Sequence, residues 1–261
     1  MLPTLVLVHG AWMSPASWQG WIDRYQARGY RVVAPAWPHD DRPVPDLVRA
    51  PDPALASVGV EEIVAHYEAQ IAAVDGPVLL VGHSFGGLFV QLLLDRGVGL
   101  AGVAIDPAPP KGVLPSFSAL KAGGPALFAG PIATMSFADF HWGWMHTQPE
   151  AEARAAYDTY VVPTPSRVYK QGAAAPFTDL MRVRPEARRQ PLLFIAGGAD
   201  RTVSAGMVEA AYKMQRASPA VTDLHRFEDR THWIIGQPGW EAVADDAIGW
   251  LEGKLDLHPP G

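Results

Sequence analysis

The sequence contains no cysteine, which excludes disulfides, zinc–thiolate sites, iron–sulfur clusters and a cysteine nucleophile. It also has no excess of basic residues, because 21 Lys and Arg stand against 27 Asp and Glu, for a formal charge of −6. This balance, without any block of like charges, argues against a nucleic-acid binder and a polybasic membrane patch. With 48% hydrophobic and 18% charged residues, the chain is not intrinsically disordered in its main state.

Long hydrophobic runs are absent as well. No apolar stretch approaches the roughly 20 residues that span a bilayer. The first ten residues, MLPTLVLVHG, have no basic segment followed by a long apolar one, so they resemble a strand and not a signal peptide. We therefore expect a cytoplasmic monomer or homodimer that binds neither membranes nor nucleic acid. An export signal ahead of this sequence stays an alternative.

Short apolar, β-branched runs alternate with longer helical patterns. Most of the runs are apolar almost throughout, as in parallel strands that are covered on both faces. The expected strands are Thr4–Val8, Arg31–Ala34, Val78–Val81, Leu100–Ile105, Leu192–Ala196 and Val221–Phe227. The expected helices lie at 60–74, at 86–96 and after Pro238. This alternation predicts an α/β fold with a doubly wound, mostly parallel sheet of about six strands.

Two segments interrupt the alternation. Pro35–Pro53 is rich in Pro and Asp and is expected to be an irregular loop. Pro107–Pro185 is rich in aromatic residues and too long for a bare loop in a compact domain. We expect it to form a helical cap at 107–185, inserted into a core made of residues 1–106 and 186–261.

The sharpest motif is Gly82-His83-Ser84-Phe85-Gly86, which matches G-x-S-x-G. A strand pattern precedes it and a helical pattern follows, which is the context of a nucleophile elbow. In that turn the serine projects above the sheet, and the helix N-terminus stabilises developing negative charge. The alternative is an ordinary glycine-rich turn in which Ser84 caps the helix.

With the segment Leu7–Trp12 (LVHGAW) after the first strand, this motif makes the chain resemble the α/β-hydrolase family over nearly its whole length. The resemblance implies an oxyanion hole formed by the backbone N–H groups of Ala11 and Phe85. Trp12 is a weaker candidate for the first donor and a candidate for the pocket wall. The family sheet has two strands ahead of the HG turn that this sequence lacks, so we expect a truncated core.

The family places its catalytic residues in the order serine, acid, histidine. Asp200 follows a strand and a glycine turn and is the expected acid, although Asp106 also ends a strand and is a rival. His232 lies between the last strand and the last helix, where the family histidine stands. The other two histidines after Asp200 are weaker candidates, because His225 lies in a strand and His258 in the tail.

No cofactor is expected. The segment Gly97–Gly102 matches G-x-G-x-x-G, but it follows a helix and precedes a strand, the reverse of a dinucleotide site. His141 and His146 have no carboxylate at ligand spacing, so we expect no metal.

The sequence thus predicts a serine hydrolase that cleaves small-molecule carboxylic esters through an acyl-enzyme. Ser84 is the expected nucleophile, His232 the base and Asp200 the orienting acid. A mostly apolar pocket under the cap is expected, with wall candidates Trp12, Trp142, Trp144 and Trp233. The alternatives are a triad enzyme of another reaction (C–C hydrolase, thioesterase or lactonase) and a small-molecule sensor.

Overall fold

A six-stranded sheet is the centre of the computed structural model, which describes residues 2–259. Its order is β2-β1-β3-β4-β7-β8, and each neighbouring pair is parallel. The bounds are β1 Thr4–Val8, β2 Val32–Val33, β3 Val78–His83, β4 Gly102–Ile105, β7 Leu192–Gly197 and β8 Thr222–Phe227. The prediction of a doubly wound, six-stranded α/β sheet is confirmed.

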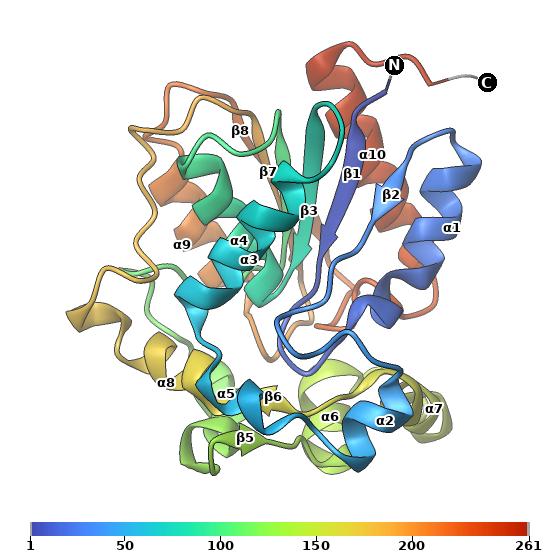
Figure 1. Cartoon of the computed structure of the whole chain (residues 1–261), viewed down its shortest axis with the longest axis vertical. Coiled ribbons are helices and arrows are strands. Elements are labelled where there is room, and N and C mark those ends of the chain that lie inside the picture. The colour runs from blue at the N-terminus through green and yellow to red at the C-terminus, as the bar shows by residue number, and fades with distance from the viewer. Residues whose placement is uncertain (1, 260–261) are drawn as a thin grey trace.

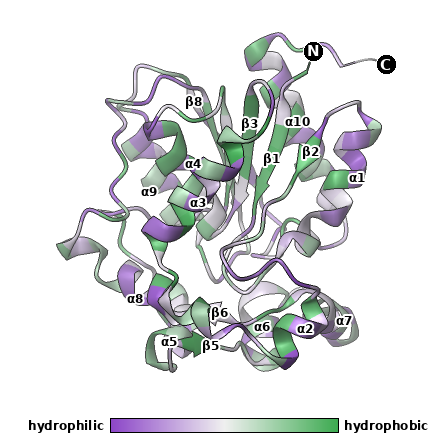
Figure 2. Cartoon of the chain, viewed as in Figure 1, coloured by the Kyte–Doolittle hydropathy of each residue, from purple (hydrophilic) through white to green (hydrophobic). Residues whose placement is uncertain are grey.

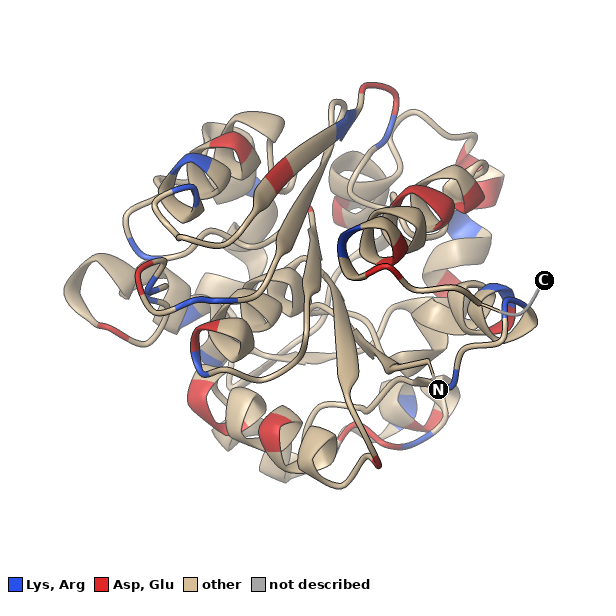
Figure 3. Cartoon of the chain, turned by 90° about the horizontal axis from the view of Figure 1, so that it is seen from above, with Lys and Arg blue, Asp and Glu red and all other residues tan. Residues whose placement is uncertain are grey.

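Helices cover both faces of this sheet (Figure 1). On one face lie α1 (Gln19–Ala27) and α10 (Trp240–Leu255), joined by a hydrogen bond from the Tyr25 hydroxyl to the carbonyl of Ala244. The other face carries α3 (Val60–Ala72), α4 (Phe85–Asp95) and α9 (Ala205–Gln215). Charged residues of both signs lie mainly on the outer helices and loops (Figure 3).

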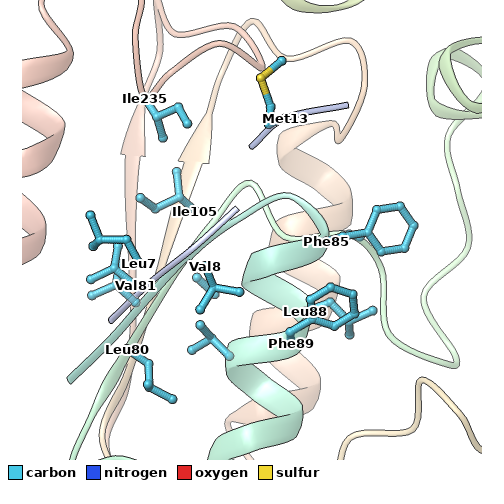
Figure 4. Packing of buried hydrophobic residues seen from close by; sticks show 14 of the residues in the cluster. Leu7, Val8, Met13, Leu80, Val81, Phe85, Leu88, Phe89, Ile105 and Ile235 are labelled. Atoms are coloured by element: carbon cyan, nitrogen blue, oxygen red, sulfur yellow. The ribbon is translucent and has the colours of Figure 1, made fainter. Parts of the chain in front are cut away.

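The core is built from strands that are apolar on both faces (Figure 2). Every residue of α4 is buried, as expected for a helix that is apolar nearly all round. In Figure 4, Val8 of β1 points toward α4, which carries Leu88 and Phe89, whereas Leu7 and Val81 lie on the other side of the strands. Burying one such side chain contributes about 1.5–3 kcal/mol. This packing fixes the position of the turn that joins β3 to α4.

Residues 107–185, called the insert below, form a separate layer beyond one end of the sheet (Figure 1). Its helices and strands are α5 Phe117–Phe128, β5 Ile132–Ala133, α6 Phe137–Trp144, α7 Glu150–Tyr160, β6 Thr164–Pro165 and α8 Ser166–Ala173. The strands β5 and β6 pair in an antiparallel two-stranded sheet. Short 3-10 helices lie at Pro15–Trp18, Pro53–Ser57 and Ala175–Phe177. Among the helices of residues 2–259, none has the length and apolarity needed to cross a membrane.

Several bounds differ from the expectation. Pro35–Pro53 is not wholly irregular, because it contains α2 (Val44–Arg49), whose Leu47 is buried against Val162 of the insert. This tertiary contact outweighs the turn-forming composition of the segment. The edge strand β2 has only two residues and pairs with β1. The other edge strand, β8, is half-buried and not apolar throughout.

A fully buried histidine follows β1. His9 donates from Nδ1 to the carbonyl of Gly10 (3.0 Å), and its Nε2 accepts from the N–H of Trp37 (3.2 Å). The two rings stack with centroids 5.2 Å apart. Burial lowers the pKa of His9 to about 4, so the imidazole is neutral in the folded protein.

This histidine makes folding sensitive to acid. Its pKa is lower in the folded than in the unfolded chain, so below about pH 6.5 the unfolded chain binds one more proton. Stability is therefore lost as the pH falls from about 6.5 to about 4, by about 1.4 kcal/mol per pH unit. Urea unfolding between these pH values measures this slope. The His9→Gln variant is expected to lower it by about that amount, since the other buried histidines titrate alike in both proteins. Equal slopes in the two proteins would contradict this assignment.

Candidate active site

Ser84 occupies a sharp turn between β3 and α4. Its φ of 56° and ψ of −123° are a strained backbone conformation for a residue with a side chain, costing about 1–3 kcal/mol. The turn is held by a hydrogen bond from the Ser84 N–H to the carbonyl of Ile105 (3.0 Å). The serine side chain makes no capping bond with α4, so it does not have the capping role that the alternative required.

Close backbone approach explains the glycines around this turn. A Cβ atom on Gly82 would overlap the carbonyl oxygen of Gly86, and one on Gly86 would overlap that of Val8. A Cβ on Gly10 would lie 2.7 Å from the Cβ of Ser84. The HG turn after β1 therefore lies directly against the serine.

Ser84, His232 and Asp200 form a continuous hydrogen-bonded chain. The Oγ of Ser84 lies 3.1 Å from Nε2 of His232, whose Nδ1 lies 2.6 Å from Oδ2 of Asp200. The His232 and Asp200 side chains are completely buried. Burial lowers the pKa of His232 to about 3, which keeps the imidazole neutral. With Nδ1–H donating to the carboxylate, Nε2 is free to accept the serine proton, the geometry of a base-activated nucleophile.

Asp200 is fixed by its own turn after β7. Its Oδ1 accepts from the backbone N–H groups of Thr202 (2.6 Å) and Val203 (2.8 Å), while Oδ2 faces the imidazole. These donors stabilise the ionised carboxylate and partly oppose the rise in pKa that burial causes. The Asp200 carboxylate, which follows a strand and two glycines, is therefore buried with both oxygens hydrogen-bonded.

The rival acid, Asp106, lies in the same cluster but has another partner. Its Oδ1 accepts from the N–H of Gly197 (2.7 Å). One carboxylate oxygen of Asp106, one of Asp200 and one ring nitrogen of His232 all lie within 4.8 Å of one another. Burial and the charge of Asp200 raise the pKa of Asp106 well above its usual range. The pair therefore shares one proton, which Asp106 carries, and Asp200 is the carboxylate that contacts the histidine.

The two expected oxyanion donors belong to residues near the serine in space or in sequence. Ala11 directly follows Gly10, and Phe85 is the first residue of α4. Within residues 2–259, neither backbone N–H donates a hydrogen bond to another group. In the described residues both N–H groups thus lack a partner, as the expected oxyanion donors require.

A cavity of about 560 Å³ lies between the serine and the insert. Most of its wall is apolar and includes Leu120, Leu127, Met181 and Met207. Four residues with polar side chains line it: Ser84, Lys111, Tyr169 and Thr202. Lys111 is paired with Asp179 at 2.9 Å. The cavity therefore suits an apolar molecule with a small polar group at the serine.

None of the four tryptophans expected in the pocket wall lines this cavity. Trp12 lies behind Tyr169 and donates from its indole to the tyrosine hydroxyl (2.6 Å). Trp144 packs edge-on against His232, with ring centroids 4.5 Å apart, and Trp233 packs on Trp144. The indole rings of Trp144 and Trp233 are therefore part of the packing around the histidine.

Trp142 has two cationic side chains close to its ring. The ammonium of Lys121 stands 3.9 Å from its ring centroid, and the guanidinium of Arg201 stands 5.5 Å away. The ring therefore serves as a cation–π platform between α6 and its neighbours.

Sequence reasoning also missed one residue that holds the site. The Nε2–H of His83 donates to the backbone carbonyl of His232 (2.9 Å). Burial lowers its pKa well below the usual range, so it stays a neutral donor. The hydrogen bond ties the end of β3 to the histidine loop. Nothing in the sequence marks this pairing, because the two residues lie far apart in the chain.

Comparisons with known proteins identify the family and the fold. A sequence model described as the alpha/beta hydrolase family matches residues 5–245. No curated protein sequence matches the chain. Among solved structures, a monoacylglycerol lipase from Paleococcus ferrophilus is 18% identical with a TM-score of 0.68, covering 97% of this chain and 96% of that one.

Two further structures are similar over the whole chain. A methylesterase from Arabidopsis is 14% identical with a TM-score of 0.69, covering 98% of this chain and 100% of that one. A pyrethroid hydrolase from Sphingobium faniae is 20% identical with a TM-score of 0.64, covering 97% and 100%. At these identities, the likeness establishes the fold.

The two buried carboxyls are expected to respond differently to amide substitution. Asp200→Asn replaces the carboxylate that accepts from Nδ1–H of His232 by a neutral amide, which no longer fixes the tautomer. It is expected to slow the reaction of Ser84 with an organophosphonate by about 10³- to 10⁴-fold. Asp106→Asn replaces a neutral acid by a neutral amide and is expected to stay within about tenfold of the unchanged protein. The rate of organophosphonate labelling, measured by intact mass, compares the two variants with the unchanged protein. A larger loss in Asp106→Asn would contradict the choice of Asp200 as the acid.

Proposed function

The chain belongs to the alpha/beta hydrolase family, and from that premise we propose that it is a serine hydrolase of carboxylic esters. The observation that carries the proposal is the hydrogen-bonded chain Ser84–His232–Asp200, with 3.1 Å and 2.6 Å between successive polar atoms. A serine hydroxyl is a poor nucleophile unless a positioned base takes its proton. His232 is buried and neutral, and the Asp200 carboxylate that faces its Nδ1 favours the tautomer in which Nε2 accepts the serine proton.

In acylation, Ser84 attacks the ester carbonyl carbon while Nε2 of His232 takes the hydroxyl proton. The N–H groups of Ala11 and Phe85 hold the oxygen that becomes negative. His232 then gives its proton to the leaving alkoxide as the carbon–oxygen bond breaks. The products of this half-reaction are an alcohol and an acyl-enzyme on Ser84.

In deacylation, His232 takes a proton from water, whose oxygen attacks the acyl carbon. The tetrahedral intermediate collapses, the proton returns to Ser84, and the carboxylic acid leaves. Asp200 stays ionised and keeps the imidazole in its tautomer and orientation throughout. Its three hydrogen-bond donors support this role.

The cavity supports a mostly apolar small-molecule ester as substrate. Its volume of about 560 Å³ lies within the range of pockets that enclose drug-sized ligands. The insert supplies much of its wall, so we propose that residues 107–185 act as a cap that selects the substrate. Two of the similar structures are named a lipase and a methylesterase, activities that cleave ester bonds.

Turnover of p-nitrophenyl esters of increasing acyl length tests the proposal. Ester hydrolysis is expected with the unchanged protein, and Ser84→Ala is expected to lower kcat by about 10⁴-fold or more. Ser204→Ala is the matched control, because this serine side chain makes no capping bond and does not line the cavity. It is expected to keep its activity.

Equal ester turnover in Ser84→Ala and the unchanged protein would overturn the proposal. Turnover of a thioester, a lactone or a C–C substrate without ester turnover would replace it by one of the other triad reactions. Tight ligand binding without turnover would replace it by a sensor.

A further inference from the structure

Tyr169 is a tyrosine in the wall of an otherwise mostly apolar cavity. It lies on α8 of the insert and faces the same cavity as Ser84. Its hydroxyl accepts a hydrogen bond from the indole N–H of Trp12, at 2.6 Å. A phenol has a donor as well as acceptor capacity, so this bond leaves the O–H proton unused.

That proton is available to a ligand. In the described part of the chain, no acceptor pairs with the Tyr169 O–H. Burial raises the pKa of Tyr169 above its ordinary value, so the group keeps its proton across the working pH range. An unused donor in an apolar cavity costs free energy until a polar atom of a ligand accepts from it.

The neighbours of Tyr169 locate this donor. Its ring packs edge-on against Phe85, with centroids 5.1 Å apart, and Phe85 carries one candidate oxyanion N–H. Its hydroxyl accepts a hydrogen bond from Trp12. Trp12 directly follows Ala11, and Ala11 carries the other candidate oxyanion N–H. Tyr169 thus contacts one candidate donor residue, Phe85, and the residue next to the other, Trp12.

Contacts between α8 and the core hold the tyrosine in place. Gln171 accepts from the N–H of Val60 at the start of α3 (2.8 Å), and Arg167 pairs with Glu62 (2.7 Å). The carbonyl of Trp12 accepts from the N–H of Val162 just before α8 (2.9 Å). A hydroxyl fixed in this way is preorganised before a substrate arrives.

We propose that the Tyr169 hydroxyl is a third oxyanion donor, supplied by the insert, that hydrogen-bonds the carbonyl oxygen of the ester as it becomes negative. The inference rests on the proposed function, because it assigns a further donor to the same reaction. The proton stays on Tyr169 throughout, so no proton is transferred and no bond is broken at this residue. It makes the insert part of the catalytic machinery as well as the wall of the pocket.

The Tyr169→Phe variant removes the hydroxyl and keeps the ring against Phe85. Because the bond strengthens as charge develops, kcat for an aryl ester is expected to fall by about 10- to 100-fold with KM nearly unchanged. Tyr157→Phe is the matched control, because that hydroxyl also lies in the insert and donates to the Met135 carbonyl, but the residue does not line the cavity. It is expected to keep kcat within about twofold.

A second measurement separates charge stabilisation from packing. An alkyl trifluoromethyl ketone adds to Ser84 and forms an oxyanion, whereas the corresponding secondary alcohol binds without one. Tyr169→Phe is expected to weaken ketone inhibition by the same factor as kcat/KM and to leave alcohol binding unchanged. Equal loss for ketone and alcohol, or unchanged kcat, would overturn the inference. Absence of ester turnover in the unchanged protein would instead overturn the proposed function, and the ketone comparison would still test the Tyr169 hydroxyl.

Discussion

The arrangement depends on one constraint: an imidazole must stay neutral, buried and correctly oriented between a hydroxyl and a carboxylate. Burial lowers the pKa of His232, and the Asp200 carboxylate fixes which ring nitrogen carries the proton. A charged imidazole could not accept from Ser84. The surrounding structure maintains this state, through the Trp144 ring on one side and the His83 hydrogen bond to the histidine backbone on another.

Parallel topology explains how residues so distant in sequence meet. Ser84 follows β3, Asp106 follows β4 and Asp200 follows β7, and the carboxyl ends of these neighbouring strands share one edge of the sheet. The same edge brings Asp106 close enough to Asp200 that both cannot be ionised. The neutral Asp106 then serves as a hydrogen-bonding link from β4 to the turn after β7, through Gly197.

The sequence was informative where chemistry and backbone geometry restrict the residue type. Ser84, Asp200 and His232 stand in motifs with a fixed context, and the structure brings all three together. The apolar runs predicted the sheet, because parallel strands that are covered on both faces require apolar side chains. The cavity wall was not predictable, because aliphatic residues such as Leu127 and Met207 have no local signal that distinguishes a wall from a core. The large tryptophans were chosen instead, and their size favours packing inside the fold.

Residues of the core and of the insert line the same cavity, among them Ser84, Phe85 and Tyr169. The central claim is that Ser84 becomes covalently acylated there. Rapid mixing with an activated aryl ester, acid quenching and intact-mass analysis with peptide mapping tests it directly. The account predicts a mass increase of one acyl group on the peptide that contains Ser84. Ester turnover without any acylated intermediate, or with the acyl group on another residue, would contradict it.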